Sequence, residues 1–396
     1  MELKPGYKQT ELGTIPEDWE TPTILELARQ IIDFRGRTPR KLGMEWGGGD
    51  IPALSAGNVK MGYIDLSEQC YFGSEALYKR WMTKGDIAKD DIVFTTEAPL
   101  GNVALVPDNR KYILSQRTIL IQVDSREASS RFFFQQMMSA RFQKLLADHS
   151  SGSTAKGIQR KKFERLKLAR PSEPEQRAIA EALSDADALL RGLDRLIAKK
   201  RDLKQAAMQQ LLSGRTRLPE FHGSWEVKRI DKLASFQRGF DLPTSKLQKG
   251  HHPVVYSNGV QNHHATFMVR GPGVVTGRSG TIGKVHFVEQ DFWPHNTTLW
   301  VTDFKGNDRR FVYYFLTRIG LERFGTGSGV PTLNRNDVHE FLVRVPPSSS
   351  AEQSTIAEVL SDMDAELAAL EQRREKTRAL KQAMMQELLT GRTRLI

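Results

Sequence analysis

The chain has 396 residues, which is longer than one ordinary domain, so two hydrophobic cores with connecting elements are expected. Its single cysteine, Cys70, excludes an internal disulfide framework, and no positively charged start precedes an apolar run, so we expect a soluble cytosolic protein. No apolar run approaches the length that spans a bilayer. A formal net charge of +11 favours a polyanionic partner.

The first segment, residues 1–172, is predicted to be a mixed α/β globule. Apolar runs bounded by turn residues indicate strands at residues 91–94 and 118–123. Phe, Met and Leu at helical spacing predict an amphipathic helix over residues 131–146. Cys70 lacks a catalytic histidine pattern and is expected to be a buried apolar residue.

A second segment, residues 219–347, looks like a diverged copy of the first. It has a predicted strand at residues 297–301 and a predicted helix at 309–324. GTIPEDW at residues 13–19 corresponds to RLPEFHGSW at 217–225, and residues 99–103 correspond to 281–285. Near the end of each segment, IQR at 158–160 corresponds to LNR at 333–335.

Each globule is followed by a copy of one helical stretch, residues 175–218 and residues 352–395. The copies align without a gap at a constant offset of 177 residues, so that Ile179 matches Ile356. The apolar positions of the second copy alternate in steps of four and three, which is typical of a coiled-coil seam. These positions are Ile356, Leu360, Met363, Leu367 and Leu370.

The first copy has the same seam until Lys200 and Lys204 interrupt it. Its apolar positions are Ile179, Leu183, Ala186, Leu190, Leu193 and Ile197, and then Leu203, Ala207 and Leu211. Each helix is predicted to continue to a capping glycine, Gly214 or Gly391.

A helix of about 40 residues would be roughly 60 Å long and would need a partner for its seam. The other copy is the expected partner, with antiparallel pairing and approximate two-fold symmetry. Packing against a globular domain and a homodimeric coiled coil are the alternatives. The predicted fold is α+β, with two mixed α/β globules separated by two long antiparallel coiled-coil helices. The domains are residues 1–172, 173–218, 219–347 and 348–396.

A search for catalytic motifs finds none. Residues 277–285 resemble a phosphate-binding loop, but Arg278 and Val285 stand where that motif needs glycine and Ser/Thr. The adjacent histidines at residues 251–252 and 263–264 are expected to be solvated loop residues rather than metal ligands.

Glycine-bearing loops with amide and guanidinium side chains recur in both globules. Arg pairs with guanine, and Asn or Gln with adenine, in the major groove, so these are candidate DNA contacts, with ordinary turn chemistry as the alternative for each. The candidates are Arg35, Arg37, Asn58 and Lys60 in the first globule, and Arg238, Asn258, Gln261, Asn262, Arg278 and Lys284 in the second.

Residues 156–162 form a strongly cationic segment that suits a phosphate backbone. Its candidate contacts are Lys156, Gln159, Arg160, Lys161 and Lys162. A solvated helix start is the alternative. The counterpart in the second globule keeps an amide and an arginine, Asn334 and Arg335, but loses most of the charge.

Several sequence marks accompany this architecture. They are Tyr7-Lys8 with Glu11-Leu12-Gly13, Ile15-Pro16 and Trp19; GTGSGVPTLNRND at residues 325–337; Glu175-Gln176 with Ile179-Ala180; and Leu211-Leu212-Ser213-Gly214. With them, essentially the whole chain resembles the specificity subunit of Type I restriction-modification systems. The first globule departs from this pattern, since SSGSTAKGIQRKK replaces Gly-Val-Pro-Thr.

The resemblance implies that each globule is a target-recognition domain for one half of a split double-stranded DNA site. The helices would set the gap between the halves and bind two modification (methyltransferase) subunits, which a restriction (nuclease-translocase) subunit joins. The chain itself would perform no chemistry and bind no cofactor. S-adenosylmethionine, ATP and Mg would belong to the partner subunits.

Two other functions fit the same pattern. One is the recognition chain or module of a related restriction enzyme that has a combined nuclease-methyltransferase subunit. The other is a coiled-coil scaffold that binds only proteins, which would show no sequence preference on DNA.

Overall fold

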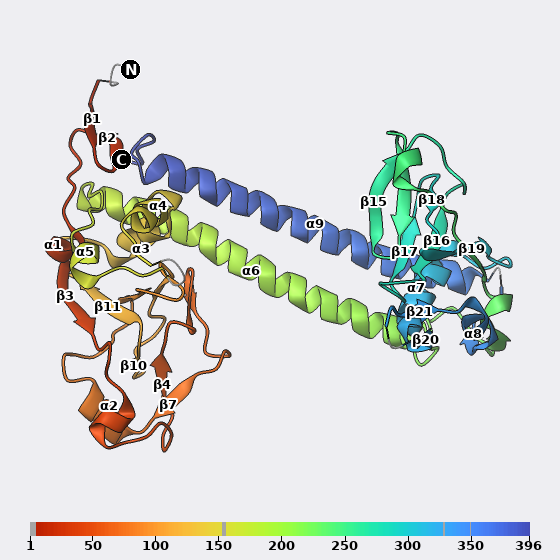
Figure 1. Ribbon diagram of the computed structural model, residues 1–396, viewed down its shortest axis with the longest axis horizontal. Helices are drawn as coiled ribbons and strands as arrows, with labels where there is room; N and C mark the ends of the chain where they lie inside the picture. The colour runs from red at the N-terminus through yellow and green to blue at the C-terminus, as the bar shows by residue number, and fades with distance from the viewer. Residues whose placement is uncertain (1–4, 153–155, 328, 349) are drawn as a thin grey trace. The chain divides into compact units, whose positions relative to one another are not determined.

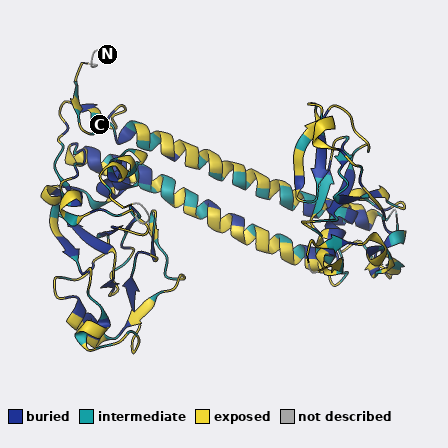
Figure 2. Cartoon of the chain, viewed as in Figure 1, coloured by how far each residue is buried: buried dark blue, intermediate teal, exposed yellow. Residues whose placement is uncertain are grey.

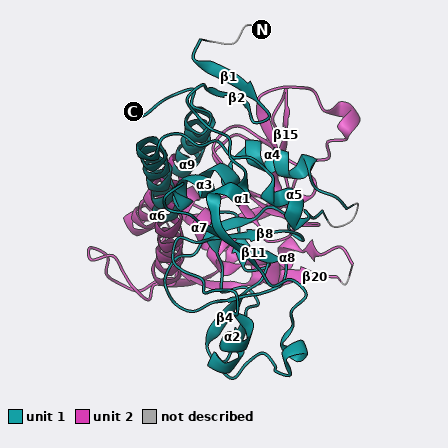
Figure 3. Ribbon diagram, turned by 90° about the vertical axis from the view of Figure 1, so that its left-hand side faces the viewer, with its two compact units in different colours: residues 1–192, 374–396 teal, residues 193–373 magenta. Residues whose placement is uncertain are grey.

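The computed structural model describes residues 5–152, 156–327, 329–348 and 350–396 (Figure 1). The chain forms two compact units, residues 1–192 with 374–396 and residues 193–373 (Figure 3). Each unit combines one globule with a stretch of each long helix, α6 (Glu173–Leu211) and α9 (Ala351–Leu388).

The globule of the first unit contains short strands and mostly short helices. In chain order they are β1 (Tyr7–Thr10), β2 (Gly13–Pro16), α1 (Ile24–Leu27), β3 (Ala28–Asp33), η1 (Pro39–Leu42), β4 (Ile51–Leu54), β5 (Val59–Lys60), β6 (Tyr63–Ile64), β7 (Tyr71–Gly73), α2 (Glu75–Trp81), β8 (Ile92–Thr95), β9 (Val103–Leu105), β10 (Ile113–Leu114), β11 (Thr118–Val123), α3 (Ser130–Met138), α4 (Ala140–Asp148) and α5 (Arg160–Glu164).

The globule of the second unit follows the same plan. Its elements are β12 (Glu226–Arg229), η2 (Ile230–Lys232), β13 (Ser235–Arg238), η3 (Thr244–Lys246), β14 (His252–Tyr256), β15 (Gly259–His264), β16 (Gly273–Gly277), β17 (Val285–Val288), β18 (Trp293–Pro294), β19 (Thr298–Asp303), α7 (Arg309–Ile319), η4 (Leu321–Phe324), β20 (Gly325–Thr326), β21 (Thr332–Leu333), α8 (Arg335–Glu340) and β22 (Leu342–Val345).

The sheets of the two globules have the same topology. A four-stranded antiparallel sheet has the order β3-β11-β8-β9 in the first and β13-β19-β16-β17 in the second. A three-stranded sheet in each contains one parallel and one antiparallel pair, in the orders β10-β4-β7 and β15-β14-β18. The predicted internal duplication is confirmed.

Each globule is built in layers around its four-stranded sheet. Along β8, Ile92 and Phe94 pack with the helices, whereas Val93, on the opposite face, packs with the three-stranded sheet. In the second unit, Val274 of β16 packs in the cluster that contains the helices, whereas Val275 packs with Val255 of the three-stranded sheet. Because side chains alternate along a strand, such central strands are apolar on both faces, and Figure 2 shows them buried.

The helix predicted over residues 131–146 is interrupted at Ser139, which separates α3 from α4. The Ser139 hydroxyl accepts a hydrogen bond from the Phe142 N–H and donates one to the Gln136 carbonyl. The hydroxyl therefore caps α4 and competes with continuous helix. In the second unit Gly320, at a φ of 70°, ends α7 before η4.

The long helices end as predicted, close to glycines in a left-handed conformation. Gly214 has a φ of 70° and Gly391 a φ of 69°. In the second case the Arg392 N–H donates to the Glu387 carbonyl at 3.0 Å, which is the long hydrogen bond of a Schellman cap.

Within each unit the two long helices run antiparallel, and each is the partner of the other. In the second unit Lys200 contacts Glu366, whereas Lys204, one turn further along α6, contacts Asp364, which lies earlier in α9. The contact of Arg217, just after the end of α6, with Glu352, at the start of α9, shows the same antiparallel direction. Near the helix ends the seams also enter the globule cores, where Ile179 and Ile356 are buried.

One part of the predicted seam is wrong. Leu203 is exposed, and Lys204 and Met208 take the inward positions. Lys204 donates to Asp364 of α9, so the residue that interrupts the apolar pattern belongs to the interface. At the equivalent place in the first unit, Lys381 of α9 pairs with Asp187 of α6 at 2.6 Å, and the lysine side chain is only 8% exposed.

A buried glutamate near the start of each long helix binds its globule. Glu175, whose side chain is 1% exposed, accepts hydrogen bonds from the Trp19 indole at 3.2 Å and from Arg394. Arg394 also pairs with Asp18 and lowers the pKa of that carboxyl group. This cluster joins the first globule, α6 and the segment after α9.

The second unit repeats the cluster at equivalent positions. Glu352, at 4% side-chain exposure, accepts from the Trp225 indole at 3.2 Å and from Arg217 at 2.7 Å. Each arginine also lies over the indole of its tryptophan.

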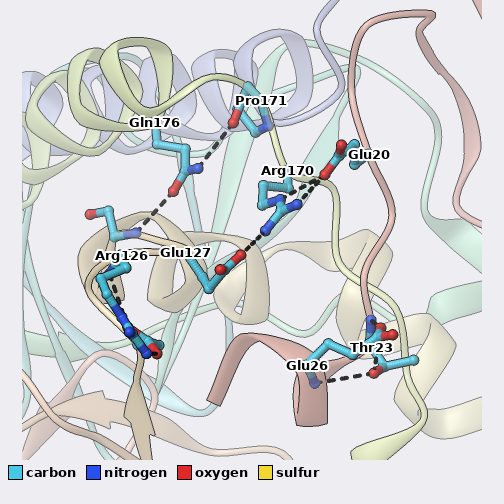
Figure 4. A network of polar contacts seen from close by, with 10 residues as sticks. Glu20, Thr23, Glu26, Arg126, Glu127, Arg170, Pro171 and Gln176 are labelled. Atoms are coloured by element: carbon cyan, nitrogen blue, oxygen red, sulfur yellow. Dashed lines mark hydrogen bonds and ion pairs between the residues drawn. The ribbon is translucent and has the colours of Figure 1, made fainter. Parts of the chain in front are cut away.

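The next residue of each helix, a glutamine, completes the attachment. Gln176 accepts from the Ser129 N–H at 2.9 Å and donates to the Pro171 carbonyl (Figure 4). Gln353 accepts from the Asp308 N–H at 3.0 Å in the same manner. Since Ser129 and Asp308 are the N-caps of α3 and α7, each glutamine fixes the start of a globule helix. Beside Gln176, Arg170 bridges two exposed carboxylates, as Figure 4 also shows.

Arg217→Met should lower the free energy of unfolding of the second unit by about 3–5 kcal/mol, because it leaves the Glu352 carboxylate buried without a cation. Urea unfolding followed by tryptophan fluorescence measures this change. The double variant Arg217→Met/Glu352→Met should recover most of the loss. Arg215→Met, at an exposed position two residues earlier, is the matched control. A loss below about 0.5 kcal/mol for Arg217→Met would contradict the role of the cluster.

Candidate nucleic-acid interface

Arg35, Arg37 and Lys60 of the first globule take part in local contacts. Arg35 pairs with Asp33 at 2.7 Å, and Lys60 pairs with Glu68 at 3.2 Å. The Arg37 guanidinium lies 4.9 Å from the centre of the Phe34 ring and donates to the Trp81 carbonyl. These contacts hold the turns in which the residues lie.

Asn58 is a correction to the predicted contacts. Its side chain is 0% exposed, its Oδ1 accepts from the Ser55 hydroxyl at 2.6 Å, and its Nδ2 donates to the Asp65 carbonyl at 3.2 Å. The amide is used in closing a turn, so it cannot reach a base. Turn chemistry was the alternative that the sequence left open.

The cationic segment contains two kinds of residue. Lys156, Gln159, Lys161 and Lys162 are exposed, as a phosphate contact requires. Arg160 instead pairs with Glu164 at 2.5 Å and donates to the Ile31 carbonyl at 3.2 Å. Its guanidinium therefore joins α5 to β3, which leaves the exposed lysines as the candidates for phosphate contacts. The Gly/Ser-rich stretches before this segment and its counterpart include residues 153–155 and 328, which lie outside the described residues.

Three loops of the first globule come together. The Ile158 N–H donates to the Thr96 carbonyl at 3.0 Å, and Gly157 pairs with Glu97. Asn102, at the other end of that loop, donates to the Val59 carbonyl at 2.8 Å. Loops distant in sequence thus form one surface.

The second globule gathers its loops in the same way. Lys284 donates to the Asn258 carbonyl at 3.4 Å, which places the β16–β17 loop beside the β14–β15 turn. The Arg278 carbonyl accepts from the Leu333 N–H at 2.7 Å, which adds the segment before α8. Asn258, Lys284 and Arg335 are exposed, and Arg278 is partly exposed.

The other candidates of this globule lie on or beside strands. Arg238 is exposed and lies 3.4 Å from Asp241. Gln261 and Asn262 lie on β15, where Gln261 is exposed and Asn262 donates to the Tyr256 hydroxyl. The Asn334 side chain caps α8 by accepting from the Asn336 N–H.

The stretch that resembles a phosphate-binding loop is a hairpin loop between β16 and β17. A Cβ on Gly277 would lie 1.8 Å from the Thr281 carbonyl oxygen, so the close approach of the backbone requires glycine. A strand and helix would flank a true phosphate loop.

Two histidines of the second globule are partly shielded from water. Burial lowers the pKa of His286, which lies under Gly259, and also that of His295. His251 is exposed and lies outside the strands, as expected. The expected loop position is wrong for His252 and His264, which face each other across β14 and β15, and His264 is buried. Cys70 is also not fully buried and donates to the Ala53 carbonyl.

Over the described residues, no group of three or more His, Cys, Asp and Glu could hold a metal ion. The described helices also include none with the length and apolar character that crossing a membrane requires.

The contacts that attach the globules to the helices were not predicted from the sequence. Trp19 and Glu175-Gln176 are prominent in the sequence, but Arg394 lies far from both along the chain. The constant offset of the two copies could have pointed to these residues, since it relates Glu175 to Glu352 and Arg217 to Arg394.

Two copies of one α+β globule, each with exposed cations and amides on gathered loops, are the features of a duplicated nucleic-acid-binding protein. The chain belongs to the family of Type I restriction modification DNA specificity domains, whose model matches residues 16–199 and 223–379.

Individual relatives agree with this assignment. A Methanocaldococcus jannaschii protein, assigned as the MjaX specificity subunit of a type I restriction enzyme, is 22% identical over 430 aligned residues, which cover 98% of this chain and 97% of the relative. The crystal structure of the S subunit of a Type I restriction-modification system from M. genitalium matches with a TM-score of 0.66 at 16% identity, covering 98% of each chain. A chain described for complex assembly and conformational transition of the type I R-M system matches with a TM-score of 0.58 at 18% identity, covering 95% of this chain and 99% of that one. These structures share the fold of this chain.

Lys161→Ala and Lys162→Ala should each weaken binding to all DNA sequences by a similar factor, because phosphate contacts carry no base information. Each change should also reduce the slope of log K against log salt by about 0.9. Titrations of specific and unrelated duplexes between about 50 and 200 mM salt measure both effects. Arg126→Ala removes an exposed arginine that pairs with Asp124 and is the matched control. An altered sequence preference or an unchanged slope would refute the phosphate role.

Proposed function

We propose that this chain is the specificity subunit of a Type I restriction-modification complex and recognises a bipartite double-stranded DNA sequence. The family match over both halves of the chain carries this conclusion. Each globule binds one half-site, and the unequal loops of the two globules give the half-sites different sequences.

The contacts divide between two kinds of side chain. The exposed lysines at residues 156, 161 and 162 hold phosphates and set the position of the first globule on the duplex. Exposed amides and guanidiniums of the second globule, such as Gln261 and Arg238, are suited to base edges. The local pairing of Arg238 with an exposed aspartate is weak enough to exchange for a base.

The chain acts as the recognition part of a larger complex. Two methyltransferase subunits bind along the long helices and supply methyl transfer with S-adenosylmethionine. A nuclease-translocase subunit joins for cleavage and uses ATP and Mg. This chain contributes no catalytic group and holds no cofactor, and the paired helices fix the gap between the half-sites.

A recognition chain for a combined nuclease-methyltransferase subunit is the second candidate, because it would share the same duplicated architecture. The neighbouring genes distinguish the two. Separate methyltransferase and nuclease-translocase genes support the Type I complex, whereas one fused gene supports the alternative.

A host that carries this gene with its methyltransferase should acquire DNA methylation at a sequence of two short specified parts separated by an unspecified gap. The physical reason is that two unlike globules on one chain bind two unlike half-sites. Sequencing of modified bases with and without the gene measures this. Deletion of this gene alone, with the methyltransferase retained, is the control and should remove the methylation. One continuous short motif would contradict the proposal.

A further inference from the structure

A pocket with aromatic walls lies in the first globule, next to the loops that carry Arg37 and Asn58. Its volume is about 400 Å³, and Thr38 and Gly57, which directly adjoin those two residues, line it. Small-molecule sites have volumes of roughly 300–1,000 Å³, so the pocket can take a ring system.

Three aromatic side chains form a fixed wall. The Trp46 ring stacks on Tyr71 with centroids 5.6 Å apart and an interplanar angle of 19°, and it lies 5.4 Å from Trp81. Trp81 is fully buried, and its indole donates to the Leu114 carbonyl at 2.8 Å. Tyr71 is 48% exposed, so apolar ring surface at this wall remains accessible to a ligand. A rigid wall loses little entropy when it binds a ligand.

The rest of the lining supplies polar groups and strained backbone. Gln116 and Arg117 bring an amide and a guanidinium. Four non-glycine residues among those described have positive φ, and two of them, Ala98 at 41° and Arg117 at 63°, line this pocket. Such strain clusters at ligand sites, where the surrounding structure maintains it.

The pocket is linked to the cationic segment through Glu97. Arg117 lies 3.3 Å from Glu97, and Glu97 pairs with Gly157, the residue after the exposed Lys156. A DNA strand held by the lysines of residues 156–162 would therefore pass beside the pocket. Aromatic faces combined with amide and guanidinium groups are the side chains that bind unstacked bases in proteins.

We propose that this pocket receives one nucleobase of the target DNA, unstacked from the duplex, with its face against the aromatic wall and its edge toward Gln116 and Arg117. The inference rests on the proposed function, because it needs a DNA target. It adds a specificity site that recognises a base turned out of the DNA double helix.

Gly57→Leu tests the pocket without removing a charge or an aromatic ring. A Cβ at residue 57 would meet only the Ser55 hydroxyl at 3.6 Å, which is ordinary contact, so the added side chain can occupy pocket volume. Tyr71→Ala removes exposed ring surface and is the second variant. Phe72→Ala is the matched control, because the next residue of the same strand has its side chain on the opposite face.

Each full chain is assembled with its methyltransferase subunit and titrated with duplexes that contain the methylated site. In one series an abasic residue replaces the partner of each base of the half-site in turn. At one position the abasic duplex should bind the wild-type complex about tenfold more tightly, because unpairing no longer opposes entry of the base. Gly57→Leu and Tyr71→Ala should lose this gain and bind the intact site about tenfold more weakly, and Phe72→Ala should behave as wild type.

The inference is overturned if no position shows the gain, or if both pocket variants bind every duplex as the wild type does. In either case a bipartite methylation pattern would leave the proposed function standing. Loss of methyltransferase binding in both pocket variants, with the abasic gain retained, would assign the pocket to a protein contact and would also overturn the inference. If the wild-type complex shows no sequence preference at all, the proposed function fails together with this site.

Discussion

A buried carboxylate near the start of each long helix is the contact on which the rest of each unit depends. Glu175 and Glu352 have almost no exposed surface, and a charge removed from water is tolerated only with a cation and hydrogen-bond donors. Arg394 and Arg217 supply the cation, and Trp19 and Trp225 supply an additional donor. The arginine follows one helix and the glutamate begins the other, so each cluster joins both helices to a globule.

The same principle governs the helix pair inside each unit. Asp187 with Lys381, and Asp364 with Lys204, are pairs of opposite charge within a largely apolar seam. Such polar positions specify register at some cost in stability. Burial raises the pKa of Tyr314, which donates to Asp364 at 2.7 Å, so this hydroxyl remains a donor at neutral pH. The charged residues that interrupt the apolar pattern therefore favour the antiparallel pairing, because each one meets an opposite charge on the other helix.

The sequence predicted the architecture well, because its repeats are local patterns with a constant offset. The strand at Thr118–Val123 and the glycine caps were predicted correctly from spacing and turn chemistry. The prediction that Leu203 lies in the seam is wrong, because spacing alone does not reveal that Lys204 points inward toward a carboxylate of the other helix. The break at Ser139 depends on a side-chain hydrogen bond that competes with the helix.

Site residues were harder to predict than elements, because one side chain can close a turn or contact a ligand. Asn58 is fully buried in its turn, whereas Asn258 occupies an exposed turn. The aromatic pocket was not predicted, since Trp46, Tyr71 and Trp81 come from separate stretches that only the folded globule brings together. The candidate loops of residues 35–37 and 57–60 adjoin it, because Thr38 and Gly57 line the pocket.

The central claim is that sequence recognition resides in two separable globules on a shared helical frame. The most direct measurement replaces residues 219–347 with the corresponding globule of a relative and sequences the modified bases in a host that carries the chimera. Because Leu211 and Ile356 of the helices enter the core of this globule, the substitute must have matching apolar contacts to fold. The account predicts that one half-site changes while the other half and the gap stay the same. A folded chimera that changes both half-sites, or neither, would contradict it.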